Sequence, residues 1–214
     1  MQGHSTNFGA GHKQQHTLAG EVCFEGVTLH KGFPGKLIIK PALANHGIVF
    51  KRIDVESATN LVKARWDSVS DTALCTTVSN ESGISVSTIE HLMAALAGCA
   101  IDNALVEINC PEIPIMDGSA RPFVDMFEKV GVYQQKASRK YIKILKPIKI
   151  LENDACIELS PAKNFSIDFE IDFDSEAIKD TSFNISLVNG AFNHEISSAR
   201  TFGFLEDVDR MRLA

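Results

Sequence analysis

The chain has 214 residues, of which 44% are hydrophobic and 22% charged, and its formal net charge is −6. These fractions are those of folded globular proteins, which excludes a disordered or fibrous chain. The acidic balance argues against a nucleic-acid partner, because such proteins carry basic surfaces that neutralise phosphates.

Residues 1–16 are polar and contain no apolar core, so they are predicted to form a flexible leader and not a secretory signal. No later apolar run is long enough to span a bilayer, and we expect a cytoplasmic protein without a transmembrane segment. The five cysteines are scattered and contain no Cys-x-x-Cys pair, which favours reduced thiols over a disulfide framework or a thiolate zinc site. We also expect a monomer.

The first half alternates strand-like and helix-like segments. Two helices are predicted over residues 88–97 and 120–130, ending at Gly98 and Gly131, which suit left-handed C-terminal caps. Runs rich in β-branched residues, bounded by Gly or Pro, predict strands. These runs are residues 18–24, 37–40, 48–53, 74–78 and 104–108.

A polar stretch at residues 134–140 predicts a boundary between a first domain, 17–136, and a second, 137–214. In the second domain, strands are predicted to begin at Tyr141 and at Ile148, and further strands are predicted over 155–159, 165–173 and 182–188. A short helix is predicted near 190–197. Phe165, Phe169 and Phe173 share one strand face and are expected in the core. The order of elements predicts an α+β fold.

The segment 205–214 reads as an unfinished amphipathic helix, so we expect the second domain to be incomplete at its C-terminus.

Ser87-Thr88-Ile89-Glu90-His91 is the first candidate for chemistry. Ser87 and Glu90 have capping-box spacing, which gives Glu90 a purely structural interpretation. His91 also has one, as a packed or solvent-facing residue. However, a helix N-terminus disfavours imidazolium and favours the neutral imidazole that a metal requires. Adjacent helical residues point about 100° apart, so Glu90 would reach a metal-bound water instead of sharing the metal with His91.

Two alternative nucleophiles are weaker. Asp117-Gly118 is first a tight-turn signal, and nothing in the sequence pairs Ser119 with a base. Cys75 lies among apolar neighbours in a predicted strand, which is typical of inert packing and not of a thiol nucleophile paired with His91.

A series of motifs resembles the UDP-3-O-acyl-N-acetylglucosamine deacetylase family. The likeness extends over about residues 17–212, with the motifs in family order. They are Leu29-His30-Lys31-Gly32, Asp71-Thr72-Ala73-Leu74-Cys75-Thr76, Ser87 to Leu96, Ile101-Asp102-Asn103, Pro111 to Ala120 and Ile196 to Phe204.

The resemblance implies a zinc-dependent hydrolase that removes acetate from an acylated UDP-sugar, the committed step of lipid A biosynthesis. It also implies two sequential domains, each a β-sheet packed on helices, in a β-α-α-β sandwich. Glu90 would be the general base, His91 a zinc ligand, and Thr201 a donor to the oxyanion. The implied substrate-site residues are Leu29, Leu74, Cys75 and Phe202, with His30 nearby.

The resemblance also implies zinc ligands that this sequence does not contain. Family members add a second His and an Asp four positions apart on a later helix, and a further His as general acid. The last histidine here, His194, precedes Thr201, and catalytic zinc ordinarily has three protein ligands. A second hypothesis is therefore a truncated, non-catalytic remnant that retains only ligand or partner binding.

Overall fold

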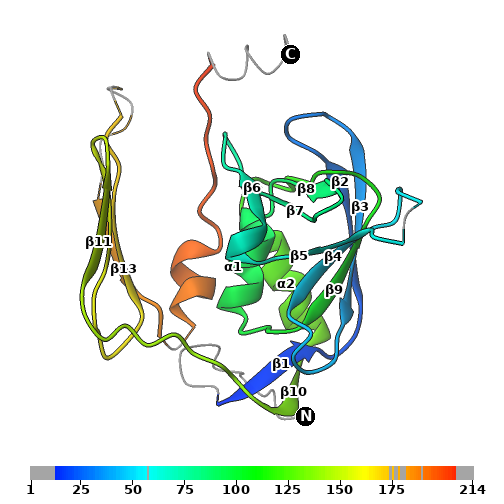
Figure 1. Ribbon diagram of the computed structural model, residues 1–214, viewed down its shortest axis with the longest axis horizontal. Helices are drawn as coiled ribbons and strands as arrows, with labels where there is room; N and C mark the ends of the chain where they lie inside the picture. The colour runs from blue at the N-terminus through cyan, green and yellow to red at the C-terminus, as the bar shows by residue number, and fades with distance from the viewer. Residues whose placement is uncertain are drawn as a thin grey trace.

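The computed structural model describes residues 13–56, 58–173, 175, 178, 182–188 and 190–205. A five-stranded sheet forms the centre of the first half (Figure 1). Its strands, in spatial order, are β2 (Val22–Val27), β3 (Pro34–Pro41), β9 (Ala104–Ile108), β4 (Ile48–Arg52) and β5 (Leu61–Lys63). Neighbours are antiparallel except β4 and β9, which run parallel. The mixed sheet and its helices confirm the predicted α+β class.

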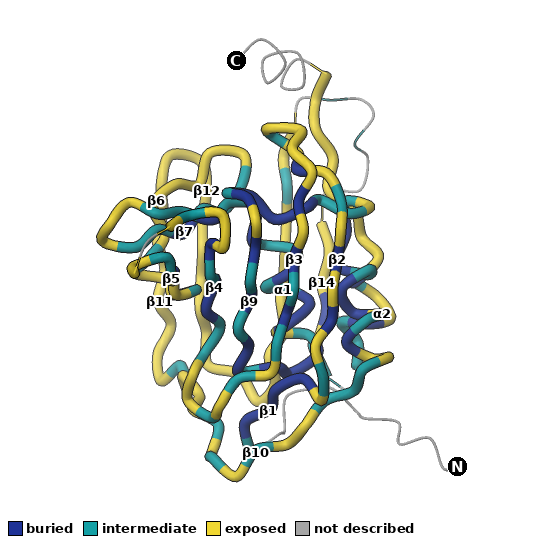
Figure 2. Tube along the Cα trace, turned by 90° about the vertical axis from the view of Figure 1, so that its right-hand side faces the viewer, coloured by how far each residue is buried: buried dark blue, intermediate teal, exposed yellow. Residues whose placement is uncertain are grey.

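The core lies between this sheet and two helices, α1 (Glu90–Gly98) and α2 (Arg121–Val130), which cover one of its faces (Figure 1). Fully buried and partly buried residues alternate along β9, as a strand with one core face requires (Figure 2). Phe24 of β2 meets Phe123 of α2 edge to face, with ring centroids 4.9 Å apart. Burial of this shared apolar surface holds the helices on the sheet.

The expected strand over residues 18–24 is two strands, because the chain turns at Ala19–Gly20. The first, β1 (Gln14–Leu18), pairs with β10 (Val132–Ser138) in a separate two-stranded sheet. A small three-stranded sheet contains β6 (Val69–Asp71), β7 (Thr77–Ser79) and β8 (Ser85–Val86), and it follows a 3-10 turn, η1 (Trp66–Ser68).

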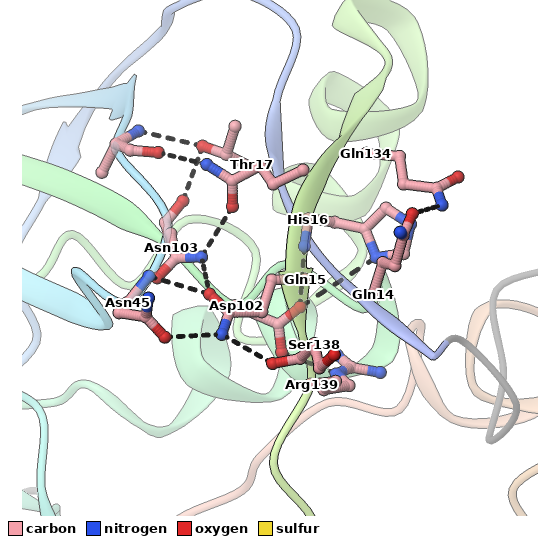
Figure 3. Close-up of polar contacts among 12 residues, drawn as sticks. Gln14, Gln15, His16, Thr17, Asn45, Asp102, Asn103, Gln134, Ser138 and Arg139 are labelled. Carbon is pink, nitrogen blue, oxygen red and sulfur yellow. Dashed lines mark hydrogen bonds and ion pairs between the residues drawn. The ribbon is translucent and has the colours of Figure 1, made fainter.

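A polar network fastens β1 and β10 to the main sheet (Figure 3). The Asn103 amide nitrogen donates to the side-chain oxygens of Gln15 and Gln135, at 2.9 and 2.7 Å. Asp102 accepts from the His16 backbone N–H at 2.8 Å and from Arg139 Nε at 2.6 Å. Asp102 and Asn103, which form one of the motifs quoted from the sequence, therefore have a structural role. They provide hydrogen-bond partners for polar groups where β1 and β10 meet the main sheet.

The described residues of the second half form two antiparallel strand pairs, called hairpins here, and a turn of π-helix. The hairpins are β11 (Ile148–Glu152) with β12 (Ala155–Leu159), and β13 (Ser166–Glu170) with β14 (Ser182–Ser186). Figure 1 shows them on the side of the helices away from the five-stranded sheet, with η2 (Phe192–Ile196) beside α1. No strand is found at Tyr141.

The structure corrects two expectations about packing. Phe165, Phe169 and Phe173, predicted to be core, are 60%, 59% and 40% exposed, because the described part of the chain leaves their face of the hairpin largely uncovered. Gly98 lies inside α1 and is not its left-handed cap; Ala100 takes the positive φ, 55°, beyond the helix end. Among the described residues, no helix has the length and apolar character needed to cross a membrane.

Candidate active site

The candidate site is built around the start of α1. The Thr76 backbone N–H donates to Glu90 Oε2 at 3.0 Å, and the Ile89 N–H approaches the Thr76 carbonyl oxygen at 3.4 Å. Glu90 is therefore held by the loop before β7 and does not reach back to its own helix.

The predicted capping box is wrong. Ile89, in α-helical conformation, occupies the N-cap position without a side-chain cap, and the Ser87 hydroxyl donates instead to the Pro111 carbonyl oxygen at 3.1 Å. Thr88, between them, has φ 56°. Positive φ is rare for a β-branched residue and costs on the order of 1–3 kcal/mol. The positive φ of Thr88 also turns the chain before the helix, so Ser87 cannot cap the first turn as a capping box requires.

Leu74 and Cys75 lie in the same loop as Thr76. Leu74 is exposed and has φ 58°, so the predicted strand over 74–78 starts only at Thr77. The Cys75 sulfur lies 3.8 Å from Thr77 Oγ1. Because Thr76 contacts Glu90, the fold places these two predicted substrate-site residues immediately before the segment that orients the predicted base.

His91 is half-buried, and its Nδ1 is buried without a hydrogen-bond partner in the described structure. A metal ligand and its supporting hydrogen bond normally satisfy both imidazole nitrogens. The His91 ring therefore has a nitrogen whose bonding capacity is not used, as expected of a histidine that can bind a metal. Within the described residues, however, no group of three or more His, Cys, Asp or Glu side chains could hold a metal ion. His91 is a candidate ligand, and the described residues do not complete a zinc site.

Glu112 is the residue that the sequence arguments missed. It is 1% exposed, and its Oε1 accepts four hydrogen bonds of 3.0 Å, from Leu29 N, His30 N, His30 Nδ1 and Thr88 Oγ1. Burial opposes ionisation, but the hydrogen bonds from His30 and Thr88 outweigh it, so the pKa of the Glu112 carboxyl lies below its ordinary value. Only its place in the Pro111 to Ala120 motif could have pointed to it.

Thr201 is anchored to the turn that follows Glu112. Its backbone N–H donates to the Gly118 carbonyl oxygen at 2.9 Å, and Arg200 Nε donates to the Asp117 carbonyl oxygen at 2.6 Å. Ser119, weighed above as a nucleophile, is buried and its hydroxyl donates to Asp117 Oδ1 at 2.8 Å. Asp117 Oδ1 also accepts from the Ser119 backbone N–H at 3.0 Å, and the Ser119 oxygen accepts from the Arg121 N–H at 3.1 Å, so these contacts close a turn.

Phe202 lies away from these contacts. Its ring meets those of Phe173 and Phe204 edge to face, with centroids 5.5 and 5.7 Å away, and it is more than half exposed. The structure thus places Phe202 in an aromatic cluster between the end of β13 and the Thr201 segment.

Residues 111–118 connect the separate parts of the site. The Ile113 N–H donates to the Ser87 carbonyl oxygen at 3.0 Å, the Ile115 N–H to Val27 at 3.1 Å, and Gly118 receives Thr201. With the bonds of Glu112 to Leu29 and His30, one segment therefore contacts the end of β2 and the turn after it, the approach to α1 and the irregular Thr201 segment. Leu29 and His30 are joined to the site through Glu112, and Thr201 through Gly118.

Residues 15–214 match the family described as LpxC, UDP-3-O-acyl N-acetylglycosamine deacetylase. Curated proteins named UDP-3-O-acyl-N-acetylglucosamine deacetylase are similar over most of this chain. Those of Idiomarina loihiensis and Shewanella frigidimarina are each 46% identical over 201 and 200 residues, covering 93% and 92% of this chain. The protein of Phenylobacterium zucineum is 43% identical over 198 residues, covering 92% of this chain and 68% of its own length.

The chain spans 65% of the length of the first two relatives. The match extends through every motif discussed above and through the buried segments that position them. This chain therefore belongs to the LpxC family of UDP-3-O-acyl-N-acetylglucosamine deacetylases.

Proposed function

We propose that the protein is a zinc-dependent amide hydrolase that removes acetate from UDP-3-O-acyl-N-acetylglucosamine in the cytoplasm, the committed step of lipid A biosynthesis. Family membership supports the reaction class. The observation that carries the proposal is the start of α1. There the Thr76 amide fixes Glu90 beside His91, a histidine with a buried nitrogen that has no hydrogen-bond partner among the described residues.

His91 would supply one ligand to zinc, which when bound contributes Lewis-acid polarisation of the amide carbonyl and its water. The remaining ligands would come from outside the described residues. Glu90 would act as general base: Oε2 receives the Thr76 N–H, which leaves Oε1 to take the proton from the attacking water. The Thr201 hydroxyl would donate a hydrogen bond to the oxyanion as the carbonyl carbon becomes tetrahedral.

Leu29, Leu74, Cys75 and Phe202 would line the site of the acylated UDP-sugar. The exposure of Leu29, Leu74 and Phe202 supports this proposal, since each leaves apolar surface available to a ligand. His30 would lie at its edge through its bond to Glu112. No nucleic-acid partner is proposed, and we expect a monomer.

We also propose two sequential domains, 17–136 and 137–214, after a leader over 1–16. Pairing of β1 with β10 closes the first unit near the proposed boundary and supports the division. The strand β10 continues past that boundary to Ser138, and residues 14–16 of the expected leader belong to β1. The layers in Figure 1, with a sheet, two helices and then the hairpins, favour the β-α-α-β sandwich. Residues 1–12 of the leader and 206–214 of the expected final helix lie outside the described residues.

A second candidate function is a non-catalytic chain that retains only ligand or partner binding. This candidate is favoured because the described residues contain no group of three or more His, Cys, Asp or Glu side chains that could hold a metal ion. Metal analysis and a deacetylation assay on the 214-residue chain separate the two. About one zinc per chain with turnover supports the hydrolase, whereas neither zinc nor turnover supports the non-catalytic chain.

The role of Glu90 is tested by Glu90→Ala in a protein that catalyses the deacetylation. Zinc content should be unchanged, because Glu90 is not a ligand, while kcat should fall by roughly 10²–10⁴-fold. Undiminished turnover would remove Glu90 from the mechanism.

A further inference from the structure

Glu112 joins two segments that are far apart in the sequence. Its Oε1 accepts from the Leu29 and His30 backbone and the His30 ring on one side, and from the Thr88 hydroxyl on the other. We propose that Glu112 is a positioning residue, whose carboxylate fixes the approach to α1 and thereby sets the place of the Glu90 carboxylate. Its consequence for turnover rests on the proposed function.

The path from Glu112 to Glu90 is short. Thr88 precedes Glu90 by two residues, and its φ of 56° is a conformation that its side chain does not favour. The hydroxyl bond to Glu112 is therefore a restraint that keeps the turn in this shape. The next two residues both contact Thr76, through the Ile89 N–H and the Glu90 carboxylate. Release of Thr88 would displace both contacts together.

The hydrogen bonds at Glu112 call for an acceptor that carries a negative charge. The groups that converge on Oε1 are two backbone N–H groups, a hydroxyl and an imidazole nitrogen, and bonds from such donors to an ionised acceptor are stronger than those to a neutral one. Oε2 is buried without a partner in the described structure. Glutamine at this position would keep one accepting oxygen and the same shape but would lose the charge, whereas alanine would lose the whole connection.

Asp102 provides a matched control. It is also a largely buried carboxylate that accepts from a backbone N–H, that of His16, and from a side chain, that of Arg139. It precedes β9, whereas Glu112 follows that strand. Asp102→Asn should therefore weaken the fold to a similar extent without reaching Glu90.

The test is amide NMR on Glu112→Ala, Glu112→Gln and Asp102→Asn. In Glu112→Ala we expect the Thr76 amide, which donates to Glu90, to shift and to lose about tenfold or more of its protection from hydrogen exchange. Glu112→Gln should restore part of that protection. Asp102→Asn should change the His16 amide and leave Thr76 as in the wild type.

A Thr76 amide that stays unchanged in a folded Glu112 variant, while Leu29 and His30 change, would overturn the proposal. Should Glu112→Ala fail to fold, Glu112→Gln decides the question by the same signal. In a protein that turns over substrate, Glu112→Ala should lower kcat about tenfold or more, because misplaced catalytic groups slow the chemical step. KM should rise as well, because Glu112 also holds Leu29 and His30 of the proposed substrate site. If Glu90→Ala does not reduce turnover, the proposed function fails, while the amide signals still report on Glu112.

Discussion

Gly98→Ala tests the packing of η2 against α1, because two opposing effects of known size meet at this position. Gly98 is the last residue of α1, and alanine is favoured over glycine in a helix by about 1 kcal/mol. A Cβ at Gly98, however, would lie 2.0 Å from the nearest carbon of the Phe192 ring and 2.5 Å from two others. Such contacts are impossible unless the Phe192 ring or the η2 backbone moves.

Forced overpacking typically costs about 1–3 kcal/mol, so the clash should equal or exceed the gain in helix propensity. We expect Gly98→Ala to lower the free energy of unfolding by up to about 2 kcal/mol, measured by urea denaturation. Ala97→Gly, at the exposed neighbouring position, calibrates the propensity alone. The double variant Gly98→Ala with Phe192→Ala should recover stability relative to the sum of the single variants. A Gly98→Ala protein that is more stable by about 1 kcal/mol would show that Phe192 does not pack there.

Three further predictions follow from the same contacts. The folded pKa of Glu112 lies below its ordinary 4.5, so its ionised carboxylate stabilises the protein above about that pH. The stability advantage of the wild type over Glu112→Gln should therefore shrink as unfolding is measured at lower pH. A difference in stability that stays constant with pH would contradict this. Burial and the nearby Glu128 raise the pKa of the Cys99 thiol to about 12. At pH 8 a thiol reagent should therefore modify the exposed Cys23 and Cys156 and spare Cys99 until the protein unfolds. Rapid labelling of Cys99 in the native protein would refute its burial. Thr88→Gly should relieve strain of about 1–3 kcal/mol. It should lose a hydrogen bond to a charged acceptor worth about 1.5–3 kcal/mol and add unfolded-chain entropy worth about 0.4–1 kcal/mol. Thermal unfolding should therefore show a net loss of stability, and a gain would mean that the Thr88 hydroxyl contributes little.

Local sequence patterns were enough to predict those strands and helices whose buried residues recur with the period of the element itself. Residues 104–108 were predicted as a strand and form β9, because alternating apolar positions need only a sheet with one buried face. The second helix was predicted to end at Gly131, and this glycine has φ 83° at the end of α2. The pairing of Glu90 with His91 at a helix start was likewise visible, since adjacent residues are placed by the helix itself.

The tertiary structure decided what those residues contact. The capping-box interpretation of Glu90 failed because Thr88 turns the chain with positive φ and sends Ser87 to Pro111. The Phe165 stripe was predicted to be core, but a period-two pattern identifies a face and does not provide the layer that covers it. The partner of Glu90 is Thr76, and Glu112 holds the approach to its helix. These contacts join residues 14 to 24 positions apart, and such pairs meet only when sheets and helices have packed, because no local propensity relates one to the other.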